Sequence, residues 1–386
     1  MTDKKRVYII AGEPSGDLLG ARLMKAMKAQ CSENIEFLGI GGPNMYAEGL
    51  TSLFPMNELS IMGLAEIIPH IPKILKRIKQ TVEDVEKQKP DCLITIDAPG
   101  FTFRVAKKLK GKGIPLIHYV APTVWAWKPG RAKKIAQFLD HLMVLLPFEP
   151  PYFKKEGLET TFVGHSVIES HMGSADGDDF KKRHGIPDNV PILCVLPGSR
   201  QSETSQLLPI FKEAIALIKE QHPSLRIVLP TVSTVSQIVK ETTLGWGIPV
   251  LVVEGDEEKF GAFKAADAAL AASGTVSLEL ALANTPSVIT YRMKKMTHWL
   301  AKRLIKVKYA SIVNLLHNRE VMPELIQDDC TPEKISQEVL KLLQNKGQDQ
   351  SQIDDLNSAM LMLGKGEKDL PSMRAAQCVL SLISKD

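Results

Sequence analysis

Hydrophobic residues along the chain gather into short runs that are apolar on both faces, and a turn and an amphipathic stretch follow each run. Two of these runs, 7–11 and 192–196, lead into turns of small residues at 12–17 and 197–200. Short runs of this kind are typical of parallel strands whose sheet is covered by helices. The pattern therefore predicts strands alternating with helices, and the two turns predict that this arrangement begins twice.

Other runs extend the alternation through both halves of the chain. The clearest helix covers 74–85, because its apolar residues form one stripe with lysine and arginine residues around it. A polar, glycine-containing stretch at 169–189 separates the two halves. Further strands are predicted near residues 37–40, 92–96, 116–120, 141–146, 225, 249 and 268.

The length and this break predict two domains. A chain of 386 residues exceeds what one hydrophobic core usually supports. The expected fold class is α/β, with two Rossmann-like, doubly wound domains at 1–168 and 169–343 that face a cleft. The last helices, within 344–386, are expected to pack back on the first domain. Because such folds bind ligands at the carboxyl ends of their strands, two domains predict sites for two substrates.

Charge indicates which classes of partner to expect, and the cysteines indicate the compartment. The net charge is +4 with acidic and basic residues mostly interleaved, which argues against a nucleic-acid-binding protein. The five cysteines have no paired spacing, so a reducing compartment is expected. No signal-peptide pattern precedes Val7, and no apolar run reaches the roughly 20 residues that cross a bilayer. These features predict a cytoplasmic protein, with peripheral attachment to a membrane left open.

Candidate nucleotide ligands lie in the second half. Ser273, Gly274 and Thr275 follow an apolar strand and precede a predicted helix. Ser273 or Thr275 could cap that helix, and free N–H groups beside Gly274 would suit a phosphate. Glu279 shares a helix face with Thr275, and its carboxylate could accept the hydroxyls of a ribose. For this motif alone, an ordinary helix cap with a solvated glutamate is an equal alternative.

A second turn in the same half strengthens this interpretation. Ser199 and Arg200 follow the strand at 192–196, and an arginine can hold a phosphate through two hydrogen bonds. A surface arginine in a turn is the commoner alternative. Both turns, however, are expected at the carboxyl edge of one sheet, where open α/β folds bind ligands. Together they predict a pocket for a nucleotide diphosphate.

The first half offers carboxylates for acid–base chemistry. Asp97 lies directly after a predicted strand, beside a proline and apolar neighbours, which could raise its pKa towards the range useful to a general base. A turn or a helix cap is the alternative role. Glu13 and Asp17 are rival carboxylates on the first small-residue turn. That turn also contains Ser15 and Gly16 and is expected to face the same cleft.

Other signals are weaker. Asp176 and Asp178 have the spacing of a metal-binding Asp-x-Asp but lie in the predicted linker, and the histidines are scattered, so no metal site is predicted. Neither glycine-rich turn has the spacing of a dinucleotide fingerprint, which argues against a nicotinamide oxidoreductase. Trp125 and Trp127 could stack on a sugar or an acyl chain, although packing in the cleft wall is the safer interpretation.

Seven short motifs together resemble one known family, the lipid-A-disaccharide synthases. They occur in the family's order across nearly the whole chain, and the set is far more specific than any one motif. The resemblance implies an inverting GT-B-type glycosyltransferase without metal or cofactor, acting at the cytoplasmic face of the inner membrane in Gram-negative bacteria. The motifs are 12–17 (GEPSGD), 96–99 (IDAP), 124–127 (VWAW), 162–165 (FVGH), 196–200 (LPGSR), 272–275 (ASGT) and 314–316 (NLL).

The resemblance also implies a reaction and residue roles. A member would join UDP-2,3-diacylglucosamine to 2,3-diacylglucosamine 1-phosphate, giving a β-1,6-linked disaccharide of lipid A biosynthesis and UDP. By that analogy Asp97 deprotonates the acceptor 6-hydroxyl, Arg200 and the loop 273–275 hold the diphosphate, and Glu279 holds the ribose. Asn314 matches a family position needed for activity and is counted among the nucleotide-binding residues.

One motif departs from the family. After Asp-Ala-Pro the family usually continues with Asp-Phe-Asn, where this chain has Gly100, Phe101 and Thr102. The second carboxylate is absent, so Asp97 is expected to act alone or with Glu13 or Asp17.

The resemblance directs attention to two candidate membrane contacts. One is the apolar stretch 61–71 with the basic residues 73–79 of the helix that follows it, and the other is 294–306. An ordinary amphipathic helix that covers a core is the alternative for each. Two rival functions remain open at this point. Another UDP-sugar enzyme of GT-B architecture, such as a UDP-N-acetylglucosamine 2-epimerase, would share the fold. A two-domain solute-binding protein would also close a cleft, although it normally needs export.

Overall fold

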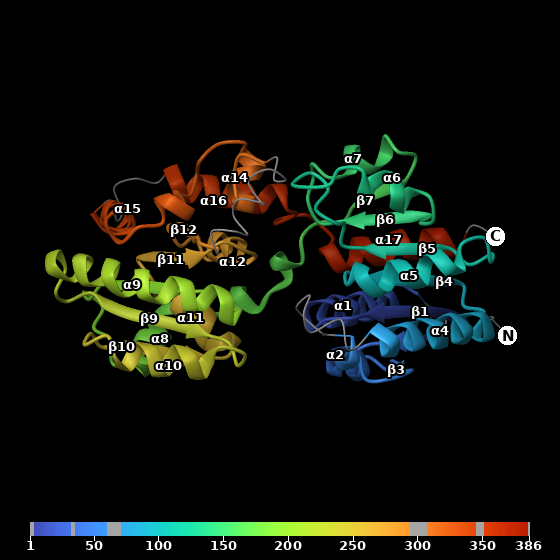
Figure 1. The fold of residues 1–386 in the computed structure, drawn as a ribbon, viewed down its shortest axis with the longest axis horizontal. Helices are drawn as coiled ribbons and strands as arrows, with labels where there is room; N and C mark the ends of the chain where they lie inside the picture. Colours follow the sequence, from blue (N-terminus) through green and yellow to red (C-terminus); the bar gives the residue numbers. More distant parts are fainter. Residues whose placement is uncertain (1–3, 32–34, 60–70, 294–306, 345–350, 385–386) are drawn as a thin grey trace. The chain divides into compact units, whose positions relative to one another are not determined.

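The structure, a computed structural model, describes residues 4–31, 35–59, 71–293, 307–344 and 351–384. The chain divides into two compact units, Met1–Ser166 with Gly366–Asp386, and Val167–Lys365 (Figure 1). Each unit contains one parallel sheet lying between helices, so the predicted α/β class with two sheets is confirmed.

The sheet of the first unit reverses its strand order between β1 and β4. These two strands pair in parallel from Val7 with Cys92 to Ala11 with Ile96, and all five residues of β4 are buried. Their carboxyl ends therefore meet at a topological switch point, where folds of this kind bind ligands. The sheet order is β3-β2-β1-β4-β5-β6-β7, with β1 Lys5–Ala11, β2 Ile35–Ile40, β3 Thr51–Ser52, β4 Cys92–Ile96, β5 Leu116–Tyr119, β6 His141–Val144 and β7 Glu159–Phe162.

The sheet of the second unit repeats this design. Its order reverses between β8 and β11, which pair from Leu193 with Ala268 to Leu196 with Ala271, and both strands are buried throughout. The loops that follow these strands contain Ser199, Arg200, Ser273, Gly274 and Thr275 of the predicted nucleotide residues. The order is β10-β9-β8-β11-β12-β13, with β8 Ile192–Leu196, β9 Arg226–Thr231, β10 Val250–Glu254, β11 Ala268–Ala272, β12 Ser287–Tyr291 and β13 Glu324–Ile326.

Helices cover both sheets and supply most of the apolar partners of the strands. The helix predicted at 74–85 is confirmed within α4, whereas β3, β7, β12 and β13 were not predicted. In the first unit the helices are α1 Pro14–Gln30, α2 Pro43–Ala47, α4 Ile71–Gln88, α5 Pro99–Leu109, α6 Arg131–Ala136, α7 Pro150–Lys154 and α17 Pro371–Ile383. In the second they are α8 Gly177–Arg183, α9 Gln201–Gln221, α10 Ser236–Leu244, α11 Asp256–Ala265, α12 Val276–Leu282, α14 Ile312–His317, α15 Pro332–Gln344 and α16 Ser351–Met362.

The last two helices of the chain belong to different units. As expected, α17 packs against α1 of the first unit, where Gln30 Nε2 donates to Met373 O at 2.8 Å. The other helix, α16, differs from the expectation for 344–386, because it packs against α12 and α14 of the second unit. His317 Nε2 and the backbone oxygen of Asp355 lie 2.9 Å apart in that contact. The return to the first unit thus begins near Gly366.

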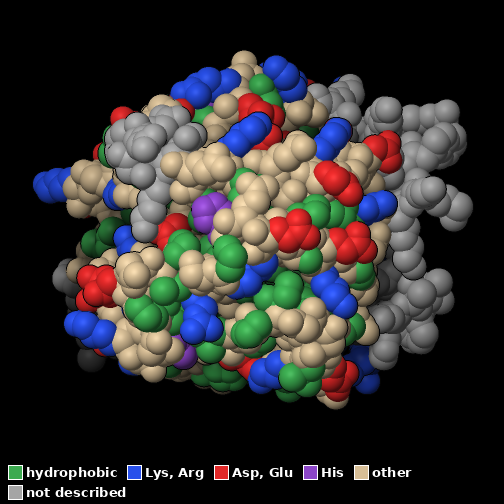
Figure 2. Space-filling model, turned by 90° about the vertical axis from the view of Figure 1, so that its left-hand side faces the viewer, with side chains coloured by type: hydrophobic (Ala, Val, Ile, Leu, Met, Phe, Trp, Pro, Cys, Tyr) green, Lys and Arg blue, Asp and Glu red, His purple; other side chains and the backbone are tan. Residues whose placement is uncertain are grey.

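The charged side chains follow the interleaving seen in the sequence. On the face that Figure 2 presents, lysine and arginine side chains lie next to aspartate and glutamate side chains. No helix in the described ranges is both long enough and apolar enough to span a bilayer. The candidate membrane segment 294–306 and most of 61–79 lie outside the described residues.

Candidate functional site

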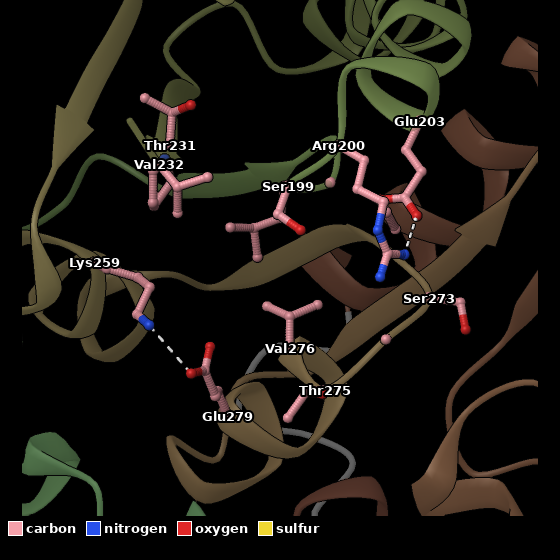
Figure 3. Close-up of a pocket in the computed structure, with 15 residues that line it drawn as sticks. Ser199, Arg200, Glu203, Thr231, Val232, Lys259, Ser273, Thr275, Val276 and Glu279 are labelled. Atoms are coloured by element: carbon pink, nitrogen blue, oxygen red, sulfur yellow. Dashed lines mark hydrogen bonds and ion pairs between the residues drawn. The ribbon is translucent and has the colours of Figure 1, made fainter. Parts of the chain in front are cut away.

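A pocket of about 290 Å³ lies at the switch point of the second unit. It is open between the loops after β8 and β11, with α11 and the end of β9 completing its wall (Figure 3). The predicted nucleotide residues other than Asn314 line this pocket together. Its lining consists of Leu196, Gly198, Ser199, Arg200, Glu203, Pro230, Thr231, Val232, Lys259, Ala272, Ser273, Gly274, Thr275, Val276 and Glu279.

The β8–α9 turn presents an arginine to this pocket. Gly198 has φ +108°, and a Cβ there would lie 2.8 Å from Glu203 Oε2, so the turn requires glycine. Arg200 is the N-cap residue of α9, and 64% of its side chain is exposed. Glu203 Oε1 accepts from Arg200 Nη1 at 3.0 Å (Figure 3). This pairing holds an exposed guanidinium at the pocket, ready for an anion.

The β11–α12 loop is shaped by backbone contacts. Thr275 is the N-cap residue of α12 but makes no side-chain cap, so the expected capping by Ser273 or Thr275 is wrong. Ser273 instead donates through its N–H to Thr290 O at 2.7 Å and through Oγ to Ala310 O at 3.3 Å. A Cβ on Gly274 would meet nothing within 4 Å, so the glycine leaves open space beside the pocket.

Glu279 faces the pocket with a partner that sequence reasoning missed. Lys259 Nζ lies 3.1 Å from Glu279 Oε1 (Figure 3). It also lies 3.3 Å from Asp256 Oδ1 and 4.4 Å from the ring centroid of Phe260. The ion pair fixes one carboxylate oxygen of Glu279, so the other oxygen has a defined direction. Glu203 could have been found from its position three residues after Arg200, whereas no sequence signal marks Lys259.

Asn314 is not a lining residue of this pocket. Its side chain is fully buried in α14, and its amide makes four hydrogen bonds with its own unit. Oδ1 accepts from the N–H groups of Val321 and Met322 at 2.8 and 2.9 Å, and Nδ2 donates to Met322 O at 2.8 Å and Glu324 Oε1 at 2.7 Å. The assignment of Asn314 as a direct nucleotide ligand is therefore wrong, because its hydrogen-bonding capacity is filled internally.

Asn314 is nevertheless connected to the pocket through a series of hydrogen bonds. Besides Asn314, Glu324 accepts from the N–H groups of Ala310 and Ser311 at 2.7 and 2.8 Å. Burial raises the pKa of Glu324, and these donors partly offset that effect. The carbonyl of Ala310 in turn accepts from Ser273. Asn314 and Glu324 thus hold the backbone segment on which the Ser273 loop rests.

Asp97 lies at the switch point of the first unit in an unusual backbone conformation. Asp97 and the following Ala98 have φ values of 47° and 46°, a left-handed region that costs non-glycine residues about 1–2 kcal/mol each. A Cβ on Gly12, at the end of β1, would lie 2.6 Å from the Cβ of Ala98. Glycine at position 12 therefore makes room for the strained turn. Such strain is typical of functional sites.

The surroundings of Asp97 favour a proton acceptor. Partial burial raises the pKa of Asp97, while the backbone N–H of Ala98 partly opposes that shift. Thr102 Oγ1 donates to the carbonyls of Asp97 at 2.7 Å and Ala98 at 3.0 Å. Thr102, one of the two residues that depart from the family motif, therefore stabilises the turn through its hydroxyl.

The first small-residue turn contains one residue with a purely structural role. Asp17 is buried, and its two oxygens accept from the N–H groups of Gly42, Asn44 and Met45 and from Asn44 Nδ2, at 2.7 to 3.1 Å. The expectation that Asp17 faces a cleft is wrong, because its carboxylate caps the N-terminus of α2. Gly16 is also buried, whereas Glu13 is half-buried and Ser15 is exposed. Of the rival carboxylates, Glu13 alone remains a candidate beside Asp97.

A further buried carboxylate anchors the tryptophan loop after β5. Glu149, only 3% exposed, accepts from Trp125 Nε1 at 3.1 Å and from Leu146 N at 3.0 Å. Burial raises the pKa of Glu149 to about 7, with the hydrogen bonds opposing this shift. The contact ties the loop after β5 to the loop after β6, and nothing in the sequence marked it.

This shift predicts a pH dependence of stability. Folding raises the pKa of Glu149 from 4.5 to about 7, so the folded state binds the proton more tightly than the unfolded chain. The unfolding free energy should therefore fall as the pH rises from about 4.5 to about 7, by on the order of 3 kcal/mol from this group. Glu149→Gln should flatten the slope in denaturant titrations at several pH values. The exposed control Glu159→Gln should not, and equal slopes for all three proteins would contradict the assignment.

No group of three or more metal-ligating side chains is found among the described residues. His118 and His141, two of the scattered histidines, make contacts with threonine side chains inside the first unit. His118 is buried with Nδ1 2.7 Å from Thr95 Oγ1, and burial lowers its pKa to about 3. His141 Nε2 lies 2.9 Å from Thr161 Oγ1.

Two parallel sheets with loops at each switch point, and a nucleotide-sized pocket in the second, define an α/β protein of the GT-B type. UDP-GlcNAc 2-epimerase from Neisseria meningitidis, solved bound to UDP-GlcNAc, has this fold with a TM-score of 0.65 and 11% identity, over 99% of this chain and 100% of that one. A glycosyltransferase from Rickettsia africae matches with a TM-score of 0.62 and 11% identity over 100% of both chains. At these identities the likeness concerns the fold alone.

Sequence similarity identifies the family within this class. The profile of a family described as Lipid-A-disaccharide synthetase matches residues 7–378. Lipid-A-disaccharide synthases of Rhodospirillum centenum and Paramagnetospirillum magneticum are 50% and 51% identical over 381 residues, which cover 98% of this chain and 95% and 97% of theirs. The chain belongs to the lipid-A-disaccharide synthase family of glycosyltransferases.

Proposed function

We propose that the chain transfers 2,3-diacylglucosamine from its UDP-linked donor to the 6-hydroxyl of 2,3-diacylglucosamine 1-phosphate, with inversion. Asp97 takes the proton of that hydroxyl while its oxygen attacks C1 of the donor sugar. The bond from C1 to the diphosphate breaks, and UDP leaves. The products are the β-1,6-linked disaccharide 1-phosphate of lipid A biosynthesis and UDP.

The single observation that carries this proposal is the pocket after β8 and β11. Arg200 offers a guanidinium for the charge that develops on the leaving diphosphate, and the open space at Gly274 suits close approach of a phosphate. Glu279, with one oxygen paired to Lys259, can accept ribose hydroxyls through the other. The first unit supplies the base, and its acceptor residues are proposed to be Glu13 and Ser15 beside Asp97.

The acylated substrates point to a membrane surface as the place of reaction. We propose that the chain works in the cytoplasm, attached peripherally to the inner membrane of a Gram-negative bacterium. The described helix α4 supports this with Leu75, 51% exposed, next to Lys76 and Lys79. Sedimentation with vesicles that contain anionic phospholipid tests the attachment.

The reaction itself is tested by product release. The purified protein should release UDP only when both acylated sugars are present, and mass spectrometry should detect the disaccharide 1-phosphate. A UDP-N-acetylglucosamine 2-epimerase would instead convert its substrate without an acceptor, and that outcome would overturn the proposal. Binding of UDP without any turnover would favour a binding protein over an enzyme.

Arg200→Ala should weaken UDP binding by roughly 10- to 100-fold, the scale of a lost charge-assisted hydrogen bond. Isothermal titration with UDP measures this directly. Arg319→Ala is the matched control, because Arg319 is 56% exposed and paired with Asp355 but does not line the pocket. Equal affinities of the Arg200 variant and the control would refute the assigned contact.

A further inference from the structure

We propose that Trp127, Lys128 and Arg131 form the binding site for the phosphate group of the acceptor sugar. This inference rests on the proposed function, since it names the site for one group of the proposed acceptor. The ligand is a phosphate monoester on a hexosamine, and the three residues lie in the loop 120–130 after β5 and at the first residue of α6.

The three side chains form one cluster around an aromatic ring. Lys128 Nζ lies 4.4 Å from the ring centroid of Trp127, and Arg131 Cζ lies 5.9 Å from it. Each of the two cations is therefore within the distance from the Trp127 ring that is typical of cation–π pairs. The backbone brings them together, because Lys128 has φ 48° and Arg131 N donates to Lys128 O at 3.0 Å.

The described residues supply no counter-ion to the two cations. Within the part of the chain that the structure describes, no carboxylate oxygen lies within 4.0 Å of Lys128 Nζ or of the Arg131 guanidinium. Some other cations of this unit are paired: Lys73 and Arg77 share Glu58, and Lys112 pairs with Glu86. Two adjacent positive charges that repel each other without a carboxylate gain most from a dianionic ligand.

The loop that carries the cluster is fixed and adjoins Asp97. Asp97 N donates to the carbonyl of Tyr119 at 3.1 Å, and the loop begins at the next residue, Val120. Trp127 N donates to Thr123 O at 3.2 Å, and Glu149 holds Trp125 of the same loop. The cluster thus belongs to the carboxyl edge of the sheet that presents the proposed base.

The chemistry of the cluster matches a phosphorylated sugar better than a bare anion. A guanidinium can bind two phosphate oxygens at once, and an ammonium adds a point charge. The indole face beside them can pack against the apolar face of a sugar ring. An acceptor whose 6-hydroxyl lies at Asp97 would then direct its phosphorylated C1 towards this loop.

The test compares acceptors with and without the phosphate. In detergent micelles free of phospholipid, the double variant K128Q/R131Q should raise KM for 2,3-diacylglucosamine 1-phosphate by about 10- to 100-fold. KM for the donor should stay unchanged, and the variant should lose the preference of the unaltered protein for the phosphorylated acceptor. The control K133Q/K134Q removes the same charge from α6 without touching Trp127, and it should retain that preference.

Three outcomes overturn the inference. An equal loss in both double variants would mean diffuse electrostatic attraction, and an unchanged preference in K128Q/R131Q would mean that the phosphate binds elsewhere. If K128Q/R131Q instead loses sedimentation with phosphatidylglycerol vesicles while keeping its preference for the phosphorylated acceptor, the cluster binds bilayer headgroups.

A binding experiment distinguishes failure of this inference from failure of the proposed function. Saturation-transfer NMR of glucosamine 1-phosphate against glucosamine needs no turnover, and the phosphorylated sugar should bind the full chain but not K128Q/R131Q. A protein that binds glucosamine 1-phosphate in this way but forms no disaccharide would contradict the proposed function and support the site. Equal signals from the two sugars would contradict the site.

Discussion

Asp97→Asn should lower kcat by about 10²- to 10⁴-fold, the scale of a lost general base. An amide has nearly the volume of a carboxyl group but cannot take the proton of the acceptor hydroxyl. The strained turn should persist, because Thr102 holds the carbonyl oxygens of Asp97 and Ala98 rather than the carboxylate. UDP release under saturating substrates measures the loss. UDP affinity and the unfolding free energy should remain close to those of the unaltered protein.

The pH profile provides a second measurement on the same residue. Burial raises the pKa of Asp97, and the ionised form is the active one. Activity should therefore fall on the acid side at a pH above the usual range of an aspartate, and kcat/KM should follow this single ionisation. Glu13→Gln is the matched comparison, because Glu13 is a half-buried carboxyl on the loop after β1. If Glu13→Gln abolished activity while Asp97→Asn did not, the base would be Glu13.

Local patterns predicted most of what positions the site. The buried runs that became β1, β4, β8 and β11 are apolar on both faces, and a small-residue turn or an aspartate follows each at the sheet edge. Within one sheet, parallel topology brings the ends of β8 and β11 together, so the pocket residues could be grouped from sequence. Short edge strands such as β3 and β13 were missed, because two or three residues give no usable periodicity.

The errors in the site residues share one cause, which is that the sequence does not show which polar groups fill a side chain's hydrogen-bonding capacity. Asp17 looked like a cleft carboxylate, yet backbone N–H groups of 42–45 surround it. Asn314 was counted as a ligand from the family resemblance, yet four hydrogen bonds within its own unit occupy its amide. Lys259 was overlooked, because its partner Glu279 lies 20 residues away on another helix. Tertiary pairing decided each of these roles.

Asn314→Ala should destabilise the second unit by about 2–4 kcal/mol, because it leaves the buried N–H groups of Val321 and Met322 without an acceptor. Glu324 would also lose a donor and release the segment at Ala310 on which Ser273 rests. Donor KM should therefore rise together with the loss of stability. Denaturant unfolding and steady-state kinetics on the same preparations measure both changes.

Two further variants separate this positioning role from direct binding. Asn314→Asp keeps an acceptor for the two N–H groups but places a second carboxyl against Glu324 Oε1, where Nδ2 now donates at 2.7 Å. The loss of unfolding free energy in Asn314→Asp should grow as the pH rises and both carboxyl groups ionise. The loss in Asn314→Ala should depend on pH far less. Asn357→Ala is the control, because Asn357 is half-buried and donates within its own helix to Ile353 O. It should cost less than about 1 kcal/mol. A direct nucleotide ligand would give the opposite pattern, in which Asn314→Ala weakens UDP binding at an unchanged unfolding free energy.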